Sequence, residues 1–298
     1  MKQNMSSIEI RSKFLEFFGN NGHTIVPSSS LIPKDDDSVL FTTAGMQQFK
    51  DYYTDKKDAQ SDFHSKNTAS IQKCIRTSDI DEVGDSSHLT FFEMFGNFSF
   101  GGYYKENAIK YAYEFITREM ALDISYITVF KGLENSPIKK DEESIKVWKS
   151  LGIKDIREEG MEDVFWGPTG SSGPCGPTTE IYCKDNKGKD LEIWNIVFNE
   201  FYCYGSREQL LESPQTVRLE SLSFKGIDTG MGLERLVMII QKVDNIYDTD
   251  IFKSAMNKIK ENSDKWDIKG ARIIADHIRA STSLIEDGVI PSNTDRGY

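Results

Sequence analysis

A long alternating run between Leu191 and Tyr204 constrains the fold of this chain more than any other feature of its sequence. Successive side chains of a β-strand point to opposite faces of a sheet, so a period of two over this length predicts a strand. One face would carry Leu191, Ile193, Asn195, Val197 and Asn199, and the other Glu192, Trp194, Ile196 and Phe198. Because both faces hold apolar side chains, we expect both to be partly buried.

Shorter patterns on either side of this run predict further strands and helices. Ser6 and Glu9 have the spacing of a capping box at the start of a helix that stops near Gly22. We expect strands at Val39–Thr43, Leu89–Phe95, Tyr126–Phe130 and Thr179–Cys183, and helices at 108–116, 141–151, 233–241, 251–260 and 272–285. Strands that follow one another without regular helical crossovers predict an α+β fold, an antiparallel β-sheet flanked by helices.

Glycine and proline crowd the segment from Gly167 to Pro177, which holds seven of these residues. We expect a shaped loop there, in which no regular element persists. Further along, the pattern becomes purely helical after Val243. The sequence therefore predicts one α+β domain over residues 1–242 and the beginning of a helical domain over residues 243–298.

Charge and cysteine usage exclude several classes of protein. Lys and Arg total 36 against 47 Asp and Glu, a net charge of -11, so DNA binding is not expected and any RNA contact needs a local basic patch. The four cysteines form no C-x-x-C pair, which argues against a zinc site or a disulfide framework. No apolar signal core or membrane-length apolar stretch occurs. We therefore expect a cytoplasmic protein with no membrane partner.

Three separated segments combine a glycine-relaxed backbone with a charged side chain. They are residues 74–76 leading into 90–101, residues 166–181, and residues 226–235. In this order and spacing they resemble the catalytic core of the alanyl-tRNA synthetases, a class II family. The resemblance extends to residues 32–33, 41–50 (FTTAGMQQFK), 194–198, 275–279 and 291–298. A single GMGLER motif would be weak, but ordered matches over almost the whole chain leave little room for chance.

The resemblance implies a class II synthetase domain followed by the start of a helical tRNA-recognition domain. Members of the family activate alanine with ATP to alanyl-adenylate and then transfer alanine to the 3′ end of tRNA(Ala). Catalysis of this kind needs no protein nucleophile, because it consists of aligning the reactants and neutralising phosphate charge. The implied cofactors are ATP and Mg²⁺, with no zinc in this portion. The chain is expected to be a fragment, a split gene product or a reduced enzyme that by itself contacts the tRNA acceptor end weakly at most.

Two arginines are the leading candidates for the nucleotide. By resemblance Arg76 clamps the α-phosphate and Arg235 holds the ATP, roles that suit the planar fork of a guanidinium. Without the resemblance, we would interpret Arg76 as one member of a surface ion pair. Arg235 would be a residue on an apolar helix whose charged end reaches the solvent. A lone histidine such as His88 is more often a structural donor than a ligand. The full set that the resemblance implies for ATP is Arg76, His88, Glu93, Met94, Trp194 and Arg235.

The amino acid needs an anionic partner for its ammonium group and a small apolar hollow for one methyl group. By resemblance Asp228 binds the amine and Val197 lines the hollow, although Asp228 alone would also pass as a helix N-cap. An asparagine in an apolar strand is the stronger signal from the residues themselves, since a buried amide without a partner is costly. The full set for alanine is Trp166, Asn195, Val197, Asp228, Gly230 and Gly232, the two glycines allowing close backbone approach.

The sequence departs from the family in places, which leaves other functions open. After Arg76 the chain lacks the common insertion with a phosphate-facing lysine, and His88 is followed by Leu89 where relatives have a second histidine. The loop at 166–170 lacks a family acidic residue. Two alternatives remain: a paralogue that delivers the adenylate to a non-tRNA acceptor, or a catalytically silent interaction module of the same fold. Arg272 and Arg279 share one helical face and would either contact RNA or form a solvated stripe.

Overall fold

A single nine-stranded sheet organises the computed structural model, which describes residues 5–34, 39–78, 80–133, 138–168 and 170–297. The strand order is β1-β2-β3-β9-β8-β7-β4-β5, with β6 paired to β7, and every pairing except β1 with β2 and β4 with β5 is antiparallel. The strands are β1 Thr24–Ile25, β2 Asn67–Ile75, β3 Phe91–Phe100, β4 Ile124–Phe130, β5 Ile156–Glu159, β6 Phe165–Trp166, β7 Gly173–Lys184, β8 Asp190–Cys203 and β9 Leu219–Gly232. The predicted α+β class is confirmed.

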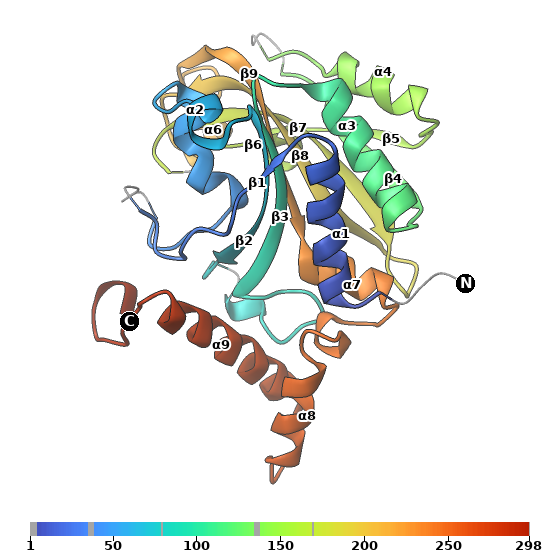
Figure 1. The fold of residues 1–298 in the computed structure, drawn as a ribbon, viewed down its shortest axis with the longest axis vertical. Helices are drawn as coiled ribbons and strands as arrows, with labels where there is room; N and C mark the ends of the chain where they lie inside the picture. The colour runs from blue at the N-terminus through green and yellow to red at the C-terminus, as the bar shows by residue number, and fades with distance from the viewer. Residues whose placement is uncertain (1–4, 35–38, 79, 134–137, 169, 298) are drawn as a thin grey trace.

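One face of the sheet is covered by helices, which lie to the right of β3 in Figure 1. They are α1 (Ser7–Asn20), α3 (Lys105–Glu114), α4 (Glu142–Ser150) and α7 (Leu233–Ile240). Their apolar stripes pack on the strands to form the main core, in which Phe14 of α1 lies 4.5 Å from the ring of Phe95. The other face carries a 3₁₀ helix over Gly45–Thr54 and leaves the middle of β3, β8 and β9 uncovered by helices. The shorter helices are α2 (Ala59–Phe63), α5 (Met161–Val164) and α6 (Arg207–Glu212).

Local signals set the ends of the helices where the sequence predicted them. The Ser6 hydroxyl accepts from the backbone N–H of Glu9, and the Glu9 carboxylate accepts from the backbone N–H of Ser6, which confirms the capping box. Asp141 caps α4 by accepting from the N–H of Ser144 at 3.1 Å. These caps satisfy backbone donors that the first turn of a helix leaves free.

Two predictions of local structure are wrong. Val39–Thr43 is not a strand, because its backbone forms only isolated hydrogen bonds and no continuous ladder with a neighbouring strand. The N–H of Thr42 donates to the carbonyl of Leu31, and the carbonyl of Thr42 accepts from the N–H of Ile75. The glycine and proline segment is not all loop, because β7 already begins at Gly173. A register shift between Cys175 and Thr178 lets the strand continue past prolines that cannot donate to the ladder.

The last two long helices, α8 (Lys253–Glu261) and α9 (Ile268–Glu286), extend beyond the end of the sheet in Figure 1. Asp276 of α9 is fully buried and accepts from the N–H and hydroxyl of Thr90, so α9 is fastened to the start of β3. Arg272 donates to the carbonyls of Gly84 and Asp85, and Arg279 is ion-paired inside the molecule. Both arginines therefore face the protein, and the domain boundary near residue 243 stays a prediction.

Among the described residues, no helix is both long enough and apolar enough to cross a membrane. The cysteines at positions 74, 175, 183 and 203 are all buried free thiols.

Gly176→Ala should destabilise the sheet strongly. A Cβ at Gly176 would lie 1.8 Å from the carbonyl oxygen of Phe198, which belongs to the backbone of the neighbouring strand and cannot move aside. Overpacking of this kind costs about 1–3 kcal/mol of unfolding free energy, and a clash with backbone that cannot relax is expected near the upper end. Urea denaturation measures it, with Gly19→Ala in α1 as the matched control, because a Cβ there meets nothing within 4 Å. Equal stability of the two variants would contradict the close approach of β7 and β8.

Candidate active site

A cavity of about 240 Å³ opens on the face of the sheet opposite the main helical core. It lies over the middle of β3, β8 and β9, and is closed at its edges by the segment before β3 and by the first turn of α7. Its walls are formed by Ala44, Arg76, Ser87, His88, Leu89, Phe92, Met94, Trp166, Glu192, Ile193, Asn195, Val197, Asp228, Gly230, Gly232, Glu234 and Arg235. Segments far apart in the sequence therefore converge on one concave site.

Strands β8 and β9 supply the floor of the cavity in strict register. Asn195 lies opposite Gly230, and Val197 lies opposite Asp228. Because directly paired residues of an antiparallel sheet point to the same face, these four positions form a compact patch with an amide, a carboxylate and a small apolar side chain. This patch has the donor and acceptor chemistry to hold a small zwitterion.

Asp228 is a buried carboxyl without a partner. The residue is 5% exposed, and its side chain makes no hydrogen bond or ion pair among the described residues. Burial raises the pKa of Asp228 to about 7, because the ionised form loses its hydration and gains nothing from the protein. A cation placed in the cavity would relieve this cost.

Asn195 is half satisfied. Its Nδ2 donates to Glu180 Oε1 at 3.0 Å, whereas its Oδ1 is buried and accepts no hydrogen bond. Glu180 lies behind it on β7, where burial and the nearby charge of Glu192 raise the pKa of Glu180 to about 7. The floor of the cavity thus contains two hydrogen-bond acceptors that lack donors, the carboxylate of Asp228 and Oδ1 of Asn195.

Two guanidinium groups also line the cavity. Arg76 Nε donates to the carbonyl of Thr43 at 3.1 Å, and its guanidinium lies over the ring of Phe92 at 5.2 Å. Arg235 lies 3.6 Å from a carboxylate oxygen of Glu192 and remains about one-third exposed. These contacts hold each guanidinium in place while leaving N–H groups for an anionic ligand.

Three further predicted residues also line the cavity. His88 is fixed by Asp85 through Nδ1 at 2.6 Å and by Glu82 through Nε2 at 3.0 Å. Met94 Sδ accepts from the backbone N–H of Gly45 at 3.3 Å, and Trp166 forms a wall at the end of β6. The structure therefore brings together ten of the twelve predicted residues: Arg76, His88, Met94, Trp166, Asn195, Val197, Asp228, Gly230, Gly232 and Arg235.

The two glycines of β9 differ in what they allow. A Cβ at Gly230 would lie 3.0 Å from the sulfur of Met94, so glycine permits the close approach of β9 to that side chain. A Cβ at Gly232 would meet nothing within 4 Å. At Gly232 the missing side chain enlarges the cavity itself, and close packing within the chain is not the reason for glycine.

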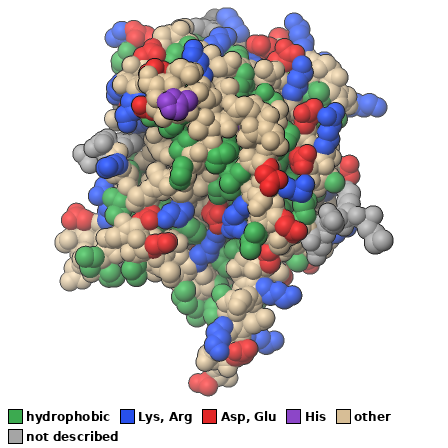
Figure 2. All heavy atoms as spheres, in the orientation of Figure 1, with side chains coloured by type: hydrophobic (Ala, Val, Ile, Leu, Met, Phe, Trp, Pro, Cys, Tyr) green, Lys and Arg blue, Asp and Glu red, His purple; other side chains and the backbone are tan. Residues whose placement is uncertain are grey.

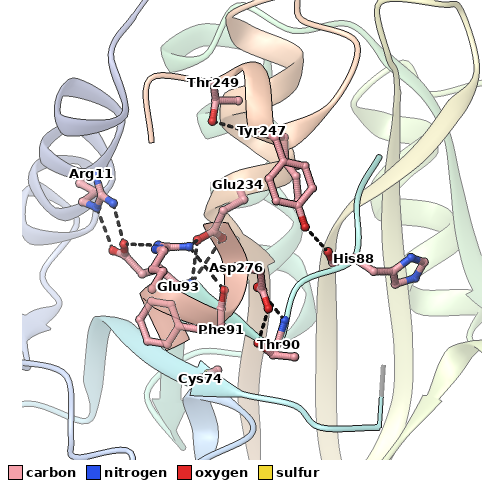
Figure 3. Close-up of polar contacts among 12 residues, drawn as sticks. Arg11, Cys74, His88, Thr90, Phe91, Glu93, Glu234, Tyr247, Thr249 and Asp276 are labelled. Atoms are coloured by element: carbon pink, nitrogen blue, oxygen red, sulfur yellow. Dashed lines mark hydrogen bonds and ion pairs between the residues drawn. The ribbon is translucent and has the colours of Figure 1, made fainter. Parts of the chain in front are cut away.

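Glu93 and Trp194, predicted for the nucleotide, lie outside the cavity. Glu93 is adjacent to Met94 in β3, and Trp194 is adjacent to Asn195 in β8, and both neighbours line the cavity. Because successive side chains of a strand point to opposite faces, Glu93 and Trp194 face away from the cavity. Trp194 is fully buried in the helical core, 5.7 Å from the ring of Phe115. Glu93 accepts from Arg11 at 2.6 and 2.8 Å and from Arg279 at 3.1 Å, a network shown in Figure 3. Burial opposes ionisation of Glu93, but these arginines outweigh it and lower its pKa.

Sequence reasoning missed two carboxylates of the site, Glu180 and Glu192. Glu192 lies three residues before Asn195 and lines the cavity beside Arg235, whereas Glu180 lies beneath Asn195. The alternating pattern assigned Glu192 to the other face, which the register shift between Ile181 and Tyr182 on the paired strand accounts for. Glu180 could have been found as a carboxylate inside an otherwise apolar strand, the signal that singled out Asn195.

Comparison with known proteins agrees with this geometry. A family model described as tRNA synthetases class II (A) matches residues 9–298. The chain belongs to the class II tRNA synthetases. Among curated proteins, this synthetase chain is 43% identical over 317 residues to an alanine–tRNA ligase of Borrelia hermsii, covering 97% of the chain and 51% of that protein. It is 40% identical over 328 residues to an alanine–tRNA ligase of Rubrobacter xylanophilus, covering 99% and 35%.

The resemblance inferred from the motifs is thereby confirmed, and the chain spans about a third to a half of the length of these relatives. Among solved structures, the apo histidyl-tRNA synthetase of S. aureus superposes with a TM-score of 0.52 at 11% identity, covering 91% of this chain and 84% of that one. That likeness supports the class II fold.

Asp228→Asn should stabilise this synthetase domain. The folded-state pKa of Asp228 is raised, so the folded chain holds the proton more tightly and loses stability as pH rises from about 4 to about 7. Replacing the carboxylate by a neutral amide removes that loss, about 2–4 kcal/mol at pH 8 and less at pH 5. Thermal unfolding at both pH values measures the difference. A variant less stable than the wild type at pH 8 would show that the carboxylate has a partner.

Proposed function

We propose that this chain activates alanine with ATP, forming alanyl-adenylate and pyrophosphate. The observation that carries the proposal is the buried, unpaired carboxyl of Asp228 beside Val197 in a cavity that also contains Arg76 and Arg235. A cationic amine, a small apolar group and polyphosphate are the three ligands that these side chains fit. The sequence identity of 43% and 40% to two alanine–tRNA ligases favours alanine as the amino acid that binds.

Alanine would bind with its ammonium group against Asp228 and the free oxygen of Asn195. Its methyl group would then lie against Val197, with Trp166 closing the side of the pocket. The ammonium ion supplies the donors that both acceptors lack, so binding removes two desolvation costs at once. A hollow of this size discriminates weakly against glycine and serine, which differ from alanine by one methyl or one hydroxyl group.

ATP would bind with its phosphates between Arg76 and Arg235, leaving the apolar surface of Leu89, Phe92 and Met94 for the base. The described residues hold no group of three or more His, Cys, Asp or Glu side chains placed to bind a metal ion. Magnesium typically enters such sites with the nucleotide, through phosphate oxygens and one or two carboxylates. Glu192 fits that role, because its carboxylate lines the cavity next to Arg235. Bound Mg²⁺ would neutralise phosphate charge.

In the reaction the carboxylate oxygen of alanine attacks the α-phosphorus of ATP, and the bond to the bridging oxygen of pyrophosphate breaks. The chain contributes position and charge rather than a nucleophile. Asp228 and Asn195 fix the amino end, so the carboxylate of alanine projects towards the arginines. Arg76 stabilises the negative charge that spreads over the phosphate oxygens.

We further propose that alanine is transferred to the 3′ end of tRNA(Ala) in the cytoplasm, with help from regions like those that the longer relatives contain. On the face in Figure 2, Lys and Arg side chains are interspersed with Asp and Glu. That distribution and the net charge of -11 favour at most weak contact of this portion with the tRNA acceptor end.

Alanine-dependent exchange between pyrophosphate and ATP tests the proposed activation. The wild type should exchange with alanine, less well with serine and glycine, and not without an amino acid. Asp228→Asn should raise the KM for alanine about a hundredfold, because a charged hydrogen bond is lost, while the KM for ATP changes little. Asp264→Asn, at an exposed aspartate, is the matched control. Absence of exchange in the wild type would favour a silent module, and aminoacylation of tRNA(Ala) would separate a synthetase from a paralogue.

The KM for alanine should also depend on pH. Only ionised Asp228 attracts the ammonium group, and the raised pKa of about 7 means that Asp228 gains a proton as pH falls below neutrality. Between pH 8 and pH 6 the KM for alanine should rise roughly tenfold. Glu180 gains a proton in the same range and changes the KM in the same direction. A KM that is flat from pH 8 to pH 6 would contradict ammonium binding by Asp228.

A further inference from the structure

A row of polar side chains crosses the sheet and ends at the cavity. Thr128 of β4 pairs with Glu180 of β7, Glu180 pairs with Asn195 of β8, and Asn195 pairs with Gly230 of β9. Along this row Thr128 Oγ1 donates to Glu180 Oε2 at 3.2 Å, and Asn195 Nδ2 donates to Glu180 Oε1 at 3.0 Å. Because the row ends in a glycine, Asn195 is its last side chain beside the cavity.

Glu180 has no ordinary structural reason to be a carboxylate. It is 6% exposed, and no Lys, Arg or His of the described chain forms an ion pair with it. Its oxygens accept only from neutral groups, namely Thr128, Asn195 and the hydroxyl of Tyr182 at 2.9 Å. Burying a carboxylate without a cation costs free energy, so an amide or an apolar residue would stabilise the sheet more.

The carboxylate does determine which way the amide of Asn195 faces. An ionised carboxylate only accepts hydrogen bonds, so Asn195 must turn its NH₂ group towards Glu180 and its Oδ1 away from it. That Oδ1 is the buried oxygen that lacks a donor. On the neighbouring strand, two positions before Gly230, the carboxylate of Asp228 also lacks a donor among the described residues. Two unmatched acceptors on diagonal positions suit the several donors of a primary ammonium ion.

We infer that Glu180 is a positioning residue for amino-acid recognition: it locks the side-chain amide of Asn195 with the oxygen available to the ammonium group of the substrate. This inference rests on the proposed function and assigns a new residue to it. Thr128 and Tyr182 donate to the other carboxylate oxygen, Oε2, and leave Oε1 to Asn195. If the amide were reversed, Asn195 would present N–H groups to a cation and weaken binding.

Glu180→Gln tests the inference, because glutamine has the same shape but can donate as well as accept. Its own NH₂ group can bond to Asn195 Oδ1, which permits the reversed amide. Measured at pH 8, where Glu180 and Asp228 are ionised, the KM for alanine in pyrophosphate exchange should rise about tenfold. The kcat and the KM for ATP should change by less than about twofold, because the arginine side of the cavity is untouched.

Tyr182→Phe is the matched control. It removes the hydrogen bond from the Tyr182 hydroxyl to Glu180 Oε2 but leaves the bond between Glu180 Oε1 and Asn195, so its KM for alanine should stay at the wild-type value.

A double variant, Glu180→Gln with Asn195→Asp, exchanges donor and acceptor between the two residues. The glutamine at position 180 then donates to one carboxylate oxygen of the aspartate at position 195, and the other oxygen stays available to the ammonium group. Its KM for alanine should return to within about threefold of the wild type. This variant also keeps the test decisive if Glu180→Gln folds poorly.

The outcomes separate the inference from the proposed function. A wild type without alanine-dependent exchange would overturn the proposed function. An active wild type with an unchanged KM for alanine in Glu180→Gln would overturn the inference alone. The inference would also fail if Tyr182→Phe raised the KM as much as Glu180→Gln, or if the double exchange gave no recovery, since either result is what a purely structural role predicts.

Discussion

The pleat of three neighbouring strands is the constraint on which the rest of the structure depends. In β3, β8 and β9 successive side chains alternate between the helical core and the cavity, and the same backbone therefore builds a hydrophobic interior and a polar site. Phe95, Trp194 and Met231 are fully buried on one side. Met94 and Asn195, one position away, line the cavity on the other. A shift of register by one residue would exchange the two sets.

This arrangement places buried acidic groups where their charge is costly. Asp228 and Glu180 both have a pKa raised to about 7, in each case chiefly through burial, and neither is paired with a cation among the residues that the structure describes. A fold selected for stability alone would have neutral residues at both positions. The cost is confined to the floor of the cavity, where a cationic ligand can offset it. Under the proposed function, stability and recognition are therefore opposed at the same two side chains.

The sequence was sufficient to predict the fold class, the capped helices and most of the cavity. Arg76 and Asp228 were assigned to the site from the family resemblance, and Asn195 also from its place in an otherwise apolar strand; all three line the cavity. Glu93 and Trp194 were assigned to the nucleotide from the family resemblance. In the structure each is adjacent in its strand to a cavity residue, and its side chain therefore faces away from the cavity.

Other features could not be read from the chain because they depend on partners distant in sequence. The first part of β7, from Gly173, is a strand because it pairs with β8, which lies so close that no side chain fits at Gly176; turn statistics do not reveal this. Val39–Thr43 has the composition of a strand but finds no neighbouring strand to pair with along its length. Propensity predicts the conformation of a segment only when the tertiary pairing agrees with it.

The ion-pair network behind the site shows why the helices after residue 243 matter to a cavity that they do not line. Arg279 of α9 bonds to Glu93 and to Glu234, and these two carboxylates are the immediate neighbours of Met94 and Arg235. Arg11 of α1 closes the network from the other side, and Figure 3 shows it meeting Glu93. Breaking a buried pair leaves an uncompensated charge, so the network resists displacement of either strand or helix. Through it, α9 is fastened to β3 and α7, which contribute Met94 and Arg235 to the cavity wall.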